Sequence, residues 1–549
     1  MTARTAHSVG LAGSSASLSL SQHDVRVRQR RPPPPNSGTC QLHRVGVRRP
    51  TGQYRKEERA LRLQRRARVV ALSSTTRTDT PPAQAESPED VDVRVLALVP
   101  DGEASAFRYP PALDMPVNPS WQEVMKHLGK RISWQEPTFQ MQVYTDAEAV
   151  RADVDSFQAA VSSADMVVMV GMHDSLEAEQ VIRMTSTVPT LVAMGLSTSQ
   201  ASRNYTHLKK ASRLQFMPTD TLMAQATSFI PWSQAAKDAG LLASVEELFG
   251  RGNPNDLVYS LLVLIDACVA PVKSVSVNSS IDGEVLMCMI RNCGSEVFSC
   301  VTDPACKSAL DCLENCGLND QVCSYRCITS YESPKFAEFA LCNLQKHNCL
   351  KNFATRPDKP VVLPMSEFNG EAMTHELAER LLYGWLDHEQ YSWKVVCGQN
   401  PAYDYFPCQH QIFYEAAKGK SFWYDPIFKV ETMEGEIVWR HRHYRVKRAK
   451  EPGTFMFSVL DNGVTSSEFW RVVDVEEEYE WAVLYYSGAA SPAGQAYNGA
   501  VFCTRDGNWP AKHHLPRITE SLRKCGIELW ELYEVDNCNC EGAPLKRLA

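Results

Sequence analysis

The stretch CMIRNCGSEVFSCVTDPACKSALDCLENCGLNDQVCSYRC, residues 288–327, decides how the fold of this chain is interpreted. It holds eight of the ten cysteines that fall between Cys288 and Cys349, in a chain that has eighteen. Spacings of four and seven place thiols on one face of a helix or across a helical hairpin. A block of roughly 65 residues has too small a core to stand alone, so covalent staples make physical sense.

Two kinds of site compete for these cysteines. Zinc sites favour CxxC pairs, often with histidine, but the block has no CxxC and only His347 nearby. We therefore expect disulfides and no metal, and each bridge should add about 2–4 kcal/mol of stability. The expected pairing within the block is nested. Outside the block, Cys408 is expected to be bridged to Cys538 or Cys540. The expected pairs within the block are Cys288–Cys306 around Cys293–Cys300, Cys312–Cys327 around Cys316–Cys323, and Cys342–Cys349; Cys408 and Cys538 complete the twelve half-cystines.

Short strand patterns separated by turns follow the block. They cover 393–396, 410–414, 422–430, 436–446, 455–459, 469–473, 479–486 and 499–504. A helix is expected at 371–384 before them, and a helix at 515–525 and a strand at 528–534 after them. About eight short strands at regular spacing favour an up-and-down antiparallel barrel.

The chain ahead of the block alternates strands with helices. Apolar strands are expected at 93–99, 141–144, 166–170 and 191–194, and helices at 147–161, 175–186, 235–248 and 258–265. This alternation indicates an α/β unit with a parallel sheet, whose ligand-binding edge would lie at 171–174 and 195–198. The fold class is thus multidomain, with domains at 91–275 (α/β), 285–350 (disulfide-rich and helical) and 365–549 (barrel).

Charge is unevenly spread along the chain. Residues 1–78 carry fifteen Arg and one Lys against three acids, a net of +13, while the whole chain is −7. The remainder is therefore strongly acidic, which disfavours nucleic acid as a partner. The first 78 residues, rich in Arg and Ser and poor in acids, are interpreted as a targeting segment.

Several motifs resemble the violaxanthin de-epoxidase family, and its de-epoxidase-related branch most of all. They are the cysteine run 300–349, YDYFPCQ at 403–409, WKVVCGQNPAYD at 393–404, VWRHRHYRV at 438–446 and YYSGAA at 485–490. The resemblance covers roughly 285–540 and implies a lipocalin-like barrel that holds a carotenoid. It makes residues 1–78 a plastid transit peptide and places the protein in the chloroplast, with the thylakoid lumen the compartment that suits disulfides.

The resemblance also implies site residues. Glu468 stands where the family has a tunnel aspartate two residues before a tryptophan, and Asp404 is retained, so both are expected catalytic acids. Trp470, Tyr486, Gln409 and Tyr497 are expected to bind substrate. The sequence departs from the family at Pro407, Gln411, Tyr414, Gln495 and Cys503, which removes two histidines, two carboxylates and a tyrosine.

Three functions follow from the resemblance. The first is an oxidoreductase that reduces epoxy-xanthophylls such as violaxanthin, with ascorbate as co-substrate. A xanthophyll epoxide isomerase needs the acid but no reductant, and a carotenoid-binding protein needs neither. A thylakoid lipid surface is a further expected partner, and the oligomeric state is left open.

Overall fold

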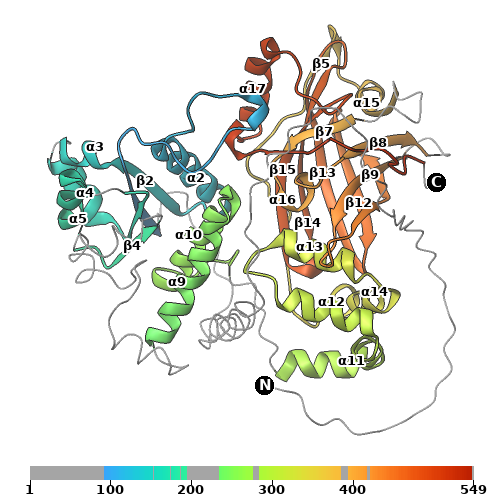
Figure 1. Cartoon of the computed structure of the whole chain (residues 1–549), viewed down its shortest axis with the longest axis horizontal. Helices are drawn as coiled ribbons and strands as arrows, with labels where there is room; N and C mark the ends of the chain where they lie inside the picture. The colour runs from blue at the N-terminus through green and yellow to red at the C-terminus, as the bar shows by residue number, and fades with distance from the viewer. Residues whose placement is uncertain are drawn as a thin grey trace.

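The computed structural model describes residues 92–151, 154–172, 175–185, 187–194, 234–275, 283–384, 393–416 and 421–546. Figure 1 shows an α/β unit beside an upright barrel, with a group of short helices below the barrel. The expected fold class is confirmed: a parallel-sheet α/β unit, a disulfide-rich helical region and an antiparallel barrel are all present. The expected targeting segment at 1–78 and the sheet-edge residues at 173–174 and 195–198 lie outside the described residues. Across the described ranges, no helix has the length and apolar character needed to span a bilayer.

The α/β unit contains four parallel strands in the order β2-β1-β3-β4. They are β1 (Val93–Val99), β2 (Phe139–Thr145), β3 (Met166–Val170) and β4 (Thr190–Met194). Strands β1, β3 and β4 are almost continuously apolar and buried, as expected of a sheet covered on both faces. The helices are α2 (Trp121–Gln135), α3 (Asp146–Arg151), α4 (Val154–Ser163), α5 (Leu176–Met184), α9 (Gln234–Gly250) and α10 (Pro254–Cys268).

The disulfide-rich region consists of short helices packed against one another. They are α11 (Gly283–Thr302), α12 (Pro304–Glu314), α13 (Gln321–Ser330), α14 (Pro334–Ala340) and the π-helical turn η2 (Leu341–Lys346). Asp303, Asp320 and Ser333 cap the starts of α12, α13 and α14 by accepting a backbone N–H three residues on. These caps fix sharp reversals between the helices.

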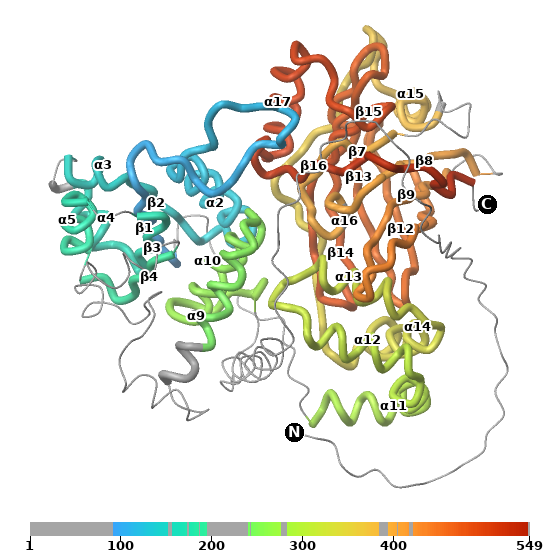
Figure 2. The backbone as a smooth tube through the Cα atoms, in the orientation of Figure 1, coloured from blue at the N-terminus to red at the C-terminus, as the bar shows by residue number. Residues whose placement is uncertain are grey.

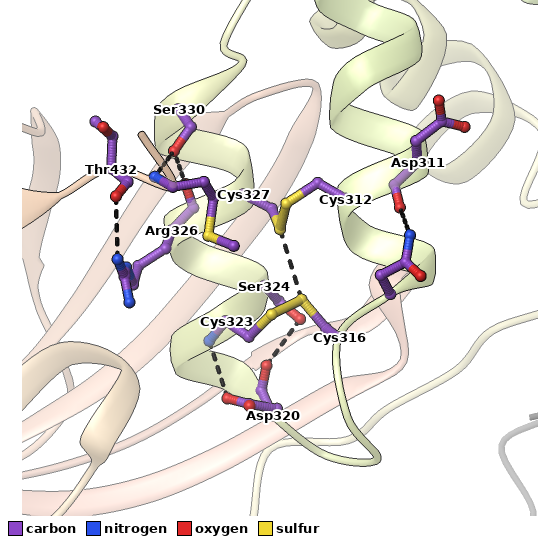
Figure 3. Close-up of a disulfide and its surroundings, with 12 residues drawn as sticks. Asp311, Cys312, Cys316, Asp320, Cys323, Ser324, Arg326, Cys327, Ser330 and Thr432 are labelled. Atoms are coloured by element: carbon purple, nitrogen blue, oxygen red, sulfur yellow. Dashed lines mark hydrogen bonds between the residues drawn. A yellow bond between two sulfur atoms is a disulfide. The ribbon is translucent and has the colours of Figure 1, made fainter. Parts of the chain in front are cut away.

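Five disulfides staple this region, and two of them are expected ones. Cys312–Cys327 joins α12 to α13, and Cys316–Cys323 joins the loop after α12 to α13, as Figure 3 shows. The other three expected pairings are wrong, because α11 packs against α14 and η2 instead of folding onto itself. The observed pairs are Cys288–Cys349, Cys293–Cys342 and Cys300–Cys306.

The barrel is a closed ring of eight antiparallel strands, because β8 pairs with both β7 and β9. Strand β10 pairs with β9 in the same register as β11, and β16 pairs with the end of β7. The ring strands are β7 (Trp393–Gly398), β8 (His410–Glu415), β9 (Ser421–Glu431), β11 (Tyr444–Arg448), β12 (Thr454–Asp461), β13 (Val464–Val475), β14 (Trp481–Ala490) and β15 (Gln495–Thr504).

Three expected elements of the barrel region are corrected. The single strand expected at 436–446 is interrupted at Arg442 and His443, which leaves two segments, β10 (Ile437–His441) and β11, that both pair with β9 in one continuous antiparallel register. The helix expected at 371–384 contains a hairpin strand, β6 (Glu371–Ala372), and only then α15 (His375–Glu379) and η3 (Arg380–Gly384). The strand expected at 528–534 is mostly a helical turn, η6 (Leu529–Glu531), before β16 (Tyr533–Glu534).

Helices close the barrel at both ends. Leu377 and Leu381 of the α15–η3 segment join the apolar core inside the barrel. At the other end, α13 lies against β9, and Arg326 donates to the backbone carbonyls of Glu431 and Thr432. Figure 2 shows α13 and α12 directly below the barrel strands. The disulfide-rich region is therefore a lid on one mouth of the barrel.

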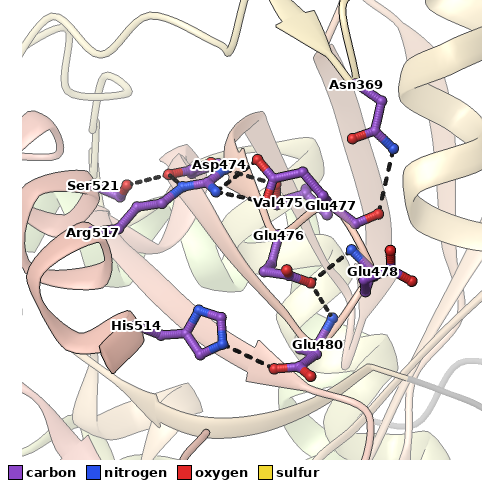
Figure 4. Close-up of polar contacts among 10 residues, drawn as sticks. All are labelled: Asn369, Asp474, Val475, Glu476, Glu477, Glu478, Glu480, His514, Arg517 and Ser521. Atoms are coloured by element: carbon purple, nitrogen blue, oxygen red, sulfur yellow. Dashed lines mark hydrogen bonds and ion pairs between the residues drawn. The ribbon is translucent and has the colours of Figure 1, made fainter. Parts of the chain in front are cut away.

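Two anchors fix the C-terminal segment to the outside of the barrel. Asp474 at the end of β13 accepts from Arg517 at 2.7 and 3.1 Å and from Ser521 at 2.6 Å, both on α17 (Leu515–Lys524), as Figure 4 shows. Cys408 is bonded to Cys540. The alternative with Cys538 is wrong; Cys538 is itself disulfide-bonded, but not to Cys408.

Candidate functional site

A small cavity lies inside the barrel at the end covered by α13. Its volume is about 70 Å³, well under the roughly 300–1,000 Å³ usual for ligand pockets. Aromatic rings fill the remainder of the interior. The lining combines these rings with buried polar groups: Tyr325, Asp404, Gln409, Gln411, Tyr424, Pro426, Phe428, Arg442, Tyr444, Val459, Asp461, Ser466, Glu468, Trp470, Tyr486, Tyr497 and Val501.

Glu468 is the acid on β13, and it is 4% exposed. Its Oε2 accepts from Trp470 Nε1 at 2.6 Å, and its Oε1 accepts from the Tyr497 hydroxyl at 2.8 Å. Ser466 completes the chain by pairing with the Tyr497 hydroxyl at 2.6 Å. Burial raises the pKa of Glu468, although the two hydrogen bonds oppose the shift. The side chain is thus suited to hold a proton in an apolar surrounding.

Asp404 is the second acid, and it is 3% exposed at the end of the helical turn α16 (Pro401–Asp404). Its Oδ2 accepts from the Asn400 backbone N–H and from the Tyr486 hydroxyl, each at 2.8 Å. Burial is the main cause that raises the pKa of Asp404 to about 7, and the charge of Glu468 acts in the same direction, while these hydrogen bonds oppose the shift. Asp404 can therefore exchange a proton near neutral pH.

Aromatic rings separate the two acids. Trp470 and Tyr486 are cross-strand partners on β13 and β14, and their rings stack with centroids 5.3 Å apart. Tyr424 extends this group at 5.5 Å from Trp470 and donates its hydroxyl to Gln411. A flat conjugated ligand that displaced these rings would find the same stacking surfaces.

Three glycines make room for the acids. A Cβ on Gly398 would lie 2.3 Å from the Cβ of Asp404, and one on Gly488 would lie 2.7 Å from the Tyr497 ring and 2.8 Å from Glu468 Cγ. A Cβ on Gly499 would lie 2.8 Å from the Tyr486 hydroxyl. Any larger residue at these positions would displace the acids or their hydrogen-bond donors.

All six expected catalytic and substrate-binding residues line this one cavity. They come from four separate parts of the chain: Asp404 and Gln409, Glu468 and Trp470, Tyr486, and Tyr497. Their chemical roles stay predictions, since position alone does not test them.

The positions that depart from the family fall in different places. Gln411 faces the cavity, whereas the Tyr414 hydroxyl donates to Asp425 on the outer side of the sheet at 2.8 Å. Cys503 is buried in the barrel core, where burial raises the pKa of its thiol. Burial also lowers the pKa of His410 to about 4. Gln495 is exposed.

Among the lining residues that were not predicted from the sequence, three lie near the lid end of the cavity. Tyr325 reaches the cavity from α13 of the disulfide-rich lid and packs against the stacked rings of Phe406 and Phe428 at 5.2 and 5.9 Å. Arg442 and Asp461 lie near the same mouth, where Arg442 Nε is 2.8 Å from Asp461 Oδ2. Tyr325 lies inside the cysteine run, two residues after Cys323, where the spacing pointed to the cysteines and not to the ring between them. The lid therefore contributes to the site as well as covering it.

Metal binding is not supported in the disulfide-rich region. Two groups of side chains lie close enough to share an ion: Cys293, Cys342 and His347, and Cys316, Cys323 and Cys327. Their sulfur atoms are bonded in disulfides, so they offer no thiolate ligands.

Comparison with known proteins finds sequences similar to the barrel and its lid. Residues 285–537 match the model of the VDE lipocalin domain. The chain is 24% identical over 273 residues to the chloroplastic violaxanthin de-epoxidase of Nicotiana tabacum and 22% identical over 275 residues to that of Arabidopsis thaliana. These alignments cover 48% of this chain and 52% and 54% of the relatives, so the chain spans about half the length of the curated relatives it matches.

Solved structures match about a third of the chain. Apocrustacyanin C1 covers 33% of this chain at 13% identity with a TM-score of 0.22, and 93% of its own chain is matched. Lobster apocrustacyanin A1 covers 34% at 12% identity with a TM-score of 0.22, and 94% of it is matched.

Proposed function

We propose that this chain, whose residues 285–537 match the VDE lipocalin domain, is an oxidoreductase that reduces epoxy-xanthophylls in its barrel. The carrying observation is that two buried acids, Asp404 and Glu468, face one cavity on either side of stacked aromatic rings. We place the protein in the chloroplast, as the names of its relatives are chloroplastic, and in the thylakoid lumen, where its disulfides would persist.

The proposed reaction removes the epoxide oxygen as water. One buried acid protonates the epoxide oxygen while a C–O bond breaks, and the stacked rings hold the polyene. Ascorbate supplies two electrons and two protons overall, so the products are an alkene, water and dehydroascorbate. Glu468 is the proposed donor, and Asp404 is the acid that exchanges protons near neutral pH.

Substrate entry requires the cavity to grow. A carotenoid is far larger than the present cavity of about 70 Å³. Tyr325, which lines the cavity from the lid and packs against Phe406 and Phe428, is the ring proposed to move when substrate enters. A thylakoid lipid surface is the proposed source of the substrate.

The test uses the purified, oxidised protein with violaxanthin in galactolipid at pH 5 and pH 7, with and without ascorbate, and pigment analysis by HPLC. Loss of the epoxide only with ascorbate supports the proposal. A new isomer formed without ascorbate would replace it with epoxide isomerisation. Unchanged pigment that co-elutes with the protein would replace it with carotenoid binding alone. Glu468→Gln is the variant that tests the proposed donor, because it keeps the side chain's size and loses the acid.

A further inference from the structure

A single buried carboxylate joins the α/β unit to the barrel. Glu531, in η6, is 1% exposed. Its Oε1 accepts from Arg131 at 2.6 Å and from Gln399 Nε2 at 3.2 Å, and its Oε2 lies 2.7 Å from His127 Nε2. Arg131 and His127 belong to α2 of the α/β unit, whereas Gln399 follows strand β7 of the barrel.

The contact around Glu531 is closely packed. Trp530 is 6% exposed and belongs to the core of the α/β unit, with its ring 5.5 Å from the rings of both Phe107 and His127. Gly526 faces Trp134, and a Cβ there would lie 2.4 Å from that ring. This close packing between segments about 400 residues apart stabilises the association of the α/β unit with the barrel.

Gln399 immediately precedes the turn that carries Asp404. Its backbone N–H donates to Ala500 of β15 at 3.2 Å. The next residue, Asn400, donates its N–H to Asp404 Oδ2 at 2.8 Å and accepts from the Asp404 N–H at 2.7 Å. The Asn400 side chain also accepts from Ala402 N–H at 3.0 Å. A shift of Gln399 would therefore move the turn that aims Asp404 at the cavity.

We infer that Glu531 is a positioning residue through which the α/β unit holds the Asn400–Asp404 turn, and with it the Asp404 carboxyl, in place. The effect on catalysis rests on the proposed function, but the effect on the turn does not. A severed link should loosen the turn even where no substrate is bound, because a side-chain hydrogen bond between buried groups is costly to leave unmade.

The experiment is hydrogen exchange followed by mass spectrometry on the full chain. Gln399→Met removes the Nε2 donor while keeping the side chain's length and the docking partners of Glu531. We expect amides at 400–404 to exchange at least tenfold faster, with amides in α2 unchanged. Glu531→Gln removes the charge that Arg131 and His127 share, and should speed exchange both at 400–404 and in α2.

Asp474→Asn is the matched control for general loss of stability. Asp474 is also a buried carboxylate that accepts from an arginine and anchors the C-terminal segment, but it has no hydrogen bond to the turn. It should leave exchange at 400–404 within twofold of the wild type. The inference is overturned if Gln399→Met leaves those amides within twofold of the wild type, or if Asp474→Asn speeds them equally.

Turnover separates this inference from the proposed function. With an active wild type, Gln399→Met should lower kcat about tenfold and leave KM within twofold, because the acid is misplaced and the aromatic surface is intact. A wild type that does not reduce violaxanthin contradicts the proposed function, yet the exchange result still decides the role of Glu531.

Discussion

Trp470 and Tyr486 stack against each other and donate hydrogen bonds to different acids. Trp470 Nε1 donates to Glu468 at 2.6 Å, and the Tyr486 hydroxyl donates to Asp404 at 2.8 Å, while the ring centroids lie 5.3 Å apart. The two acids are therefore held by the same pair of rings. A ligand that separates the rings would change the hydrogen bonding of both acids at once.

Glu468→Gln should abolish most turnover without unfolding the barrel. A general acid typically contributes a rate factor of about 10²–10⁴, whereas the amide keeps an oxygen that Tyr497 or Trp470 can donate to. We expect kcat to fall at least ~100-fold, with violaxanthin still bound, as measured by HPLC and pigment co-elution. Glu436→Gln, on an exposed turn, is the control. Turnover within threefold of the wild type would rule out Glu468 as the donor.

Asp404→Asn should stabilise the protein above neutral pH. Burial raises the pKa of Asp404 in the folded state to about 7 from 3.8. The protonated carboxyl therefore contributes fully to the free energy of unfolding below pH ~4, and this contribution is lost as the pH rises through ~7. Asparagine avoids the buried charge and can still accept from Asn400 and Tyr486. At pH 8 we expect the variant to be more stable by about 2–4 kcal/mol, and equal at pH 4.

Thermal unfolding followed by circular dichroism at pH 4, 6 and 8 measures this difference. The Tm advantage of the variant should grow as pH rises. An advantage that is the same at all three pH values would mean that Asp404 does not titrate in this range.

Gly488→Ala should disrupt the acid site through its methyl group alone. The added Cβ would lie 2.7 Å from Tyr497 and 2.8 Å from Glu468 Cγ. Overpacking of this kind costs about 1–3 kcal/mol, and it would also displace the Tyr497 donor. Gly294→Ala is the control, because a Cβ there meets nothing within 4 Å. The free energies of unfolding of the two variants in urea should differ by at least ~1 kcal/mol. Equal free energies would show that the pocket rearranges around the added methyl group without loss of stability.

Removal of the Cys408–Cys540 bridge should destabilise the barrel more than removal of Cys300–Cys306. The bridges close separations of 132 and 6 residues. Chain entropy then favours the longer loop, with contributions of about 5 and 2 kcal/mol. Paired Cys→Ser variants measured in urea check the order. A larger loss from the short bridge would show that packing around it, and not loop closure, dominates.

Tyr325→Ala should open the lid end of the barrel. The ring packs against Phe406 and Phe428 at the cavity's edge, so its removal enlarges the cavity without touching either acid. We expect the association rate of violaxanthin to rise about tenfold in stopped-flow absorbance. Phe353→Ala removes an exposed aromatic ring between the disulfide-rich region and the barrel, and should leave this rate unchanged. An unchanged rate would place the entry elsewhere.

Local patterns predicted much of the fold. Strands β1 and β3 follow from apolar runs, and the bridges Cys312–Cys327 and Cys316–Cys323 follow from spacing within one helical hairpin. Cys288 and Cys293 were paired wrongly because their partners come from η2 and the residues after it, a contact that spacing does not encode. Helix α2 was missed, although Ser120 and Glu123 form a capping box that marks its start.

The site followed from resemblance more than from pattern. Asp404 and Glu468 lie 64 positions apart on different elements, and nothing in their local sequence predicts that they share a cavity. Tyr325 and Glu531 were missed for a related reason. Each acts from a part of the chain outside the barrel strands, so its role depends on how the units pack.

Trp530 shares a hydrophobic core with Val93, near the opposite end of the described chain. During synthesis the N-terminal unit emerges first and would ordinarily fold first. Here its core stays one tryptophan short until the barrel strands have also been made. Production of the α/β unit on its own should therefore yield a protein that aggregates or is degraded, and supplying residues 526–535 as a separate peptide is the direct way to rescue it.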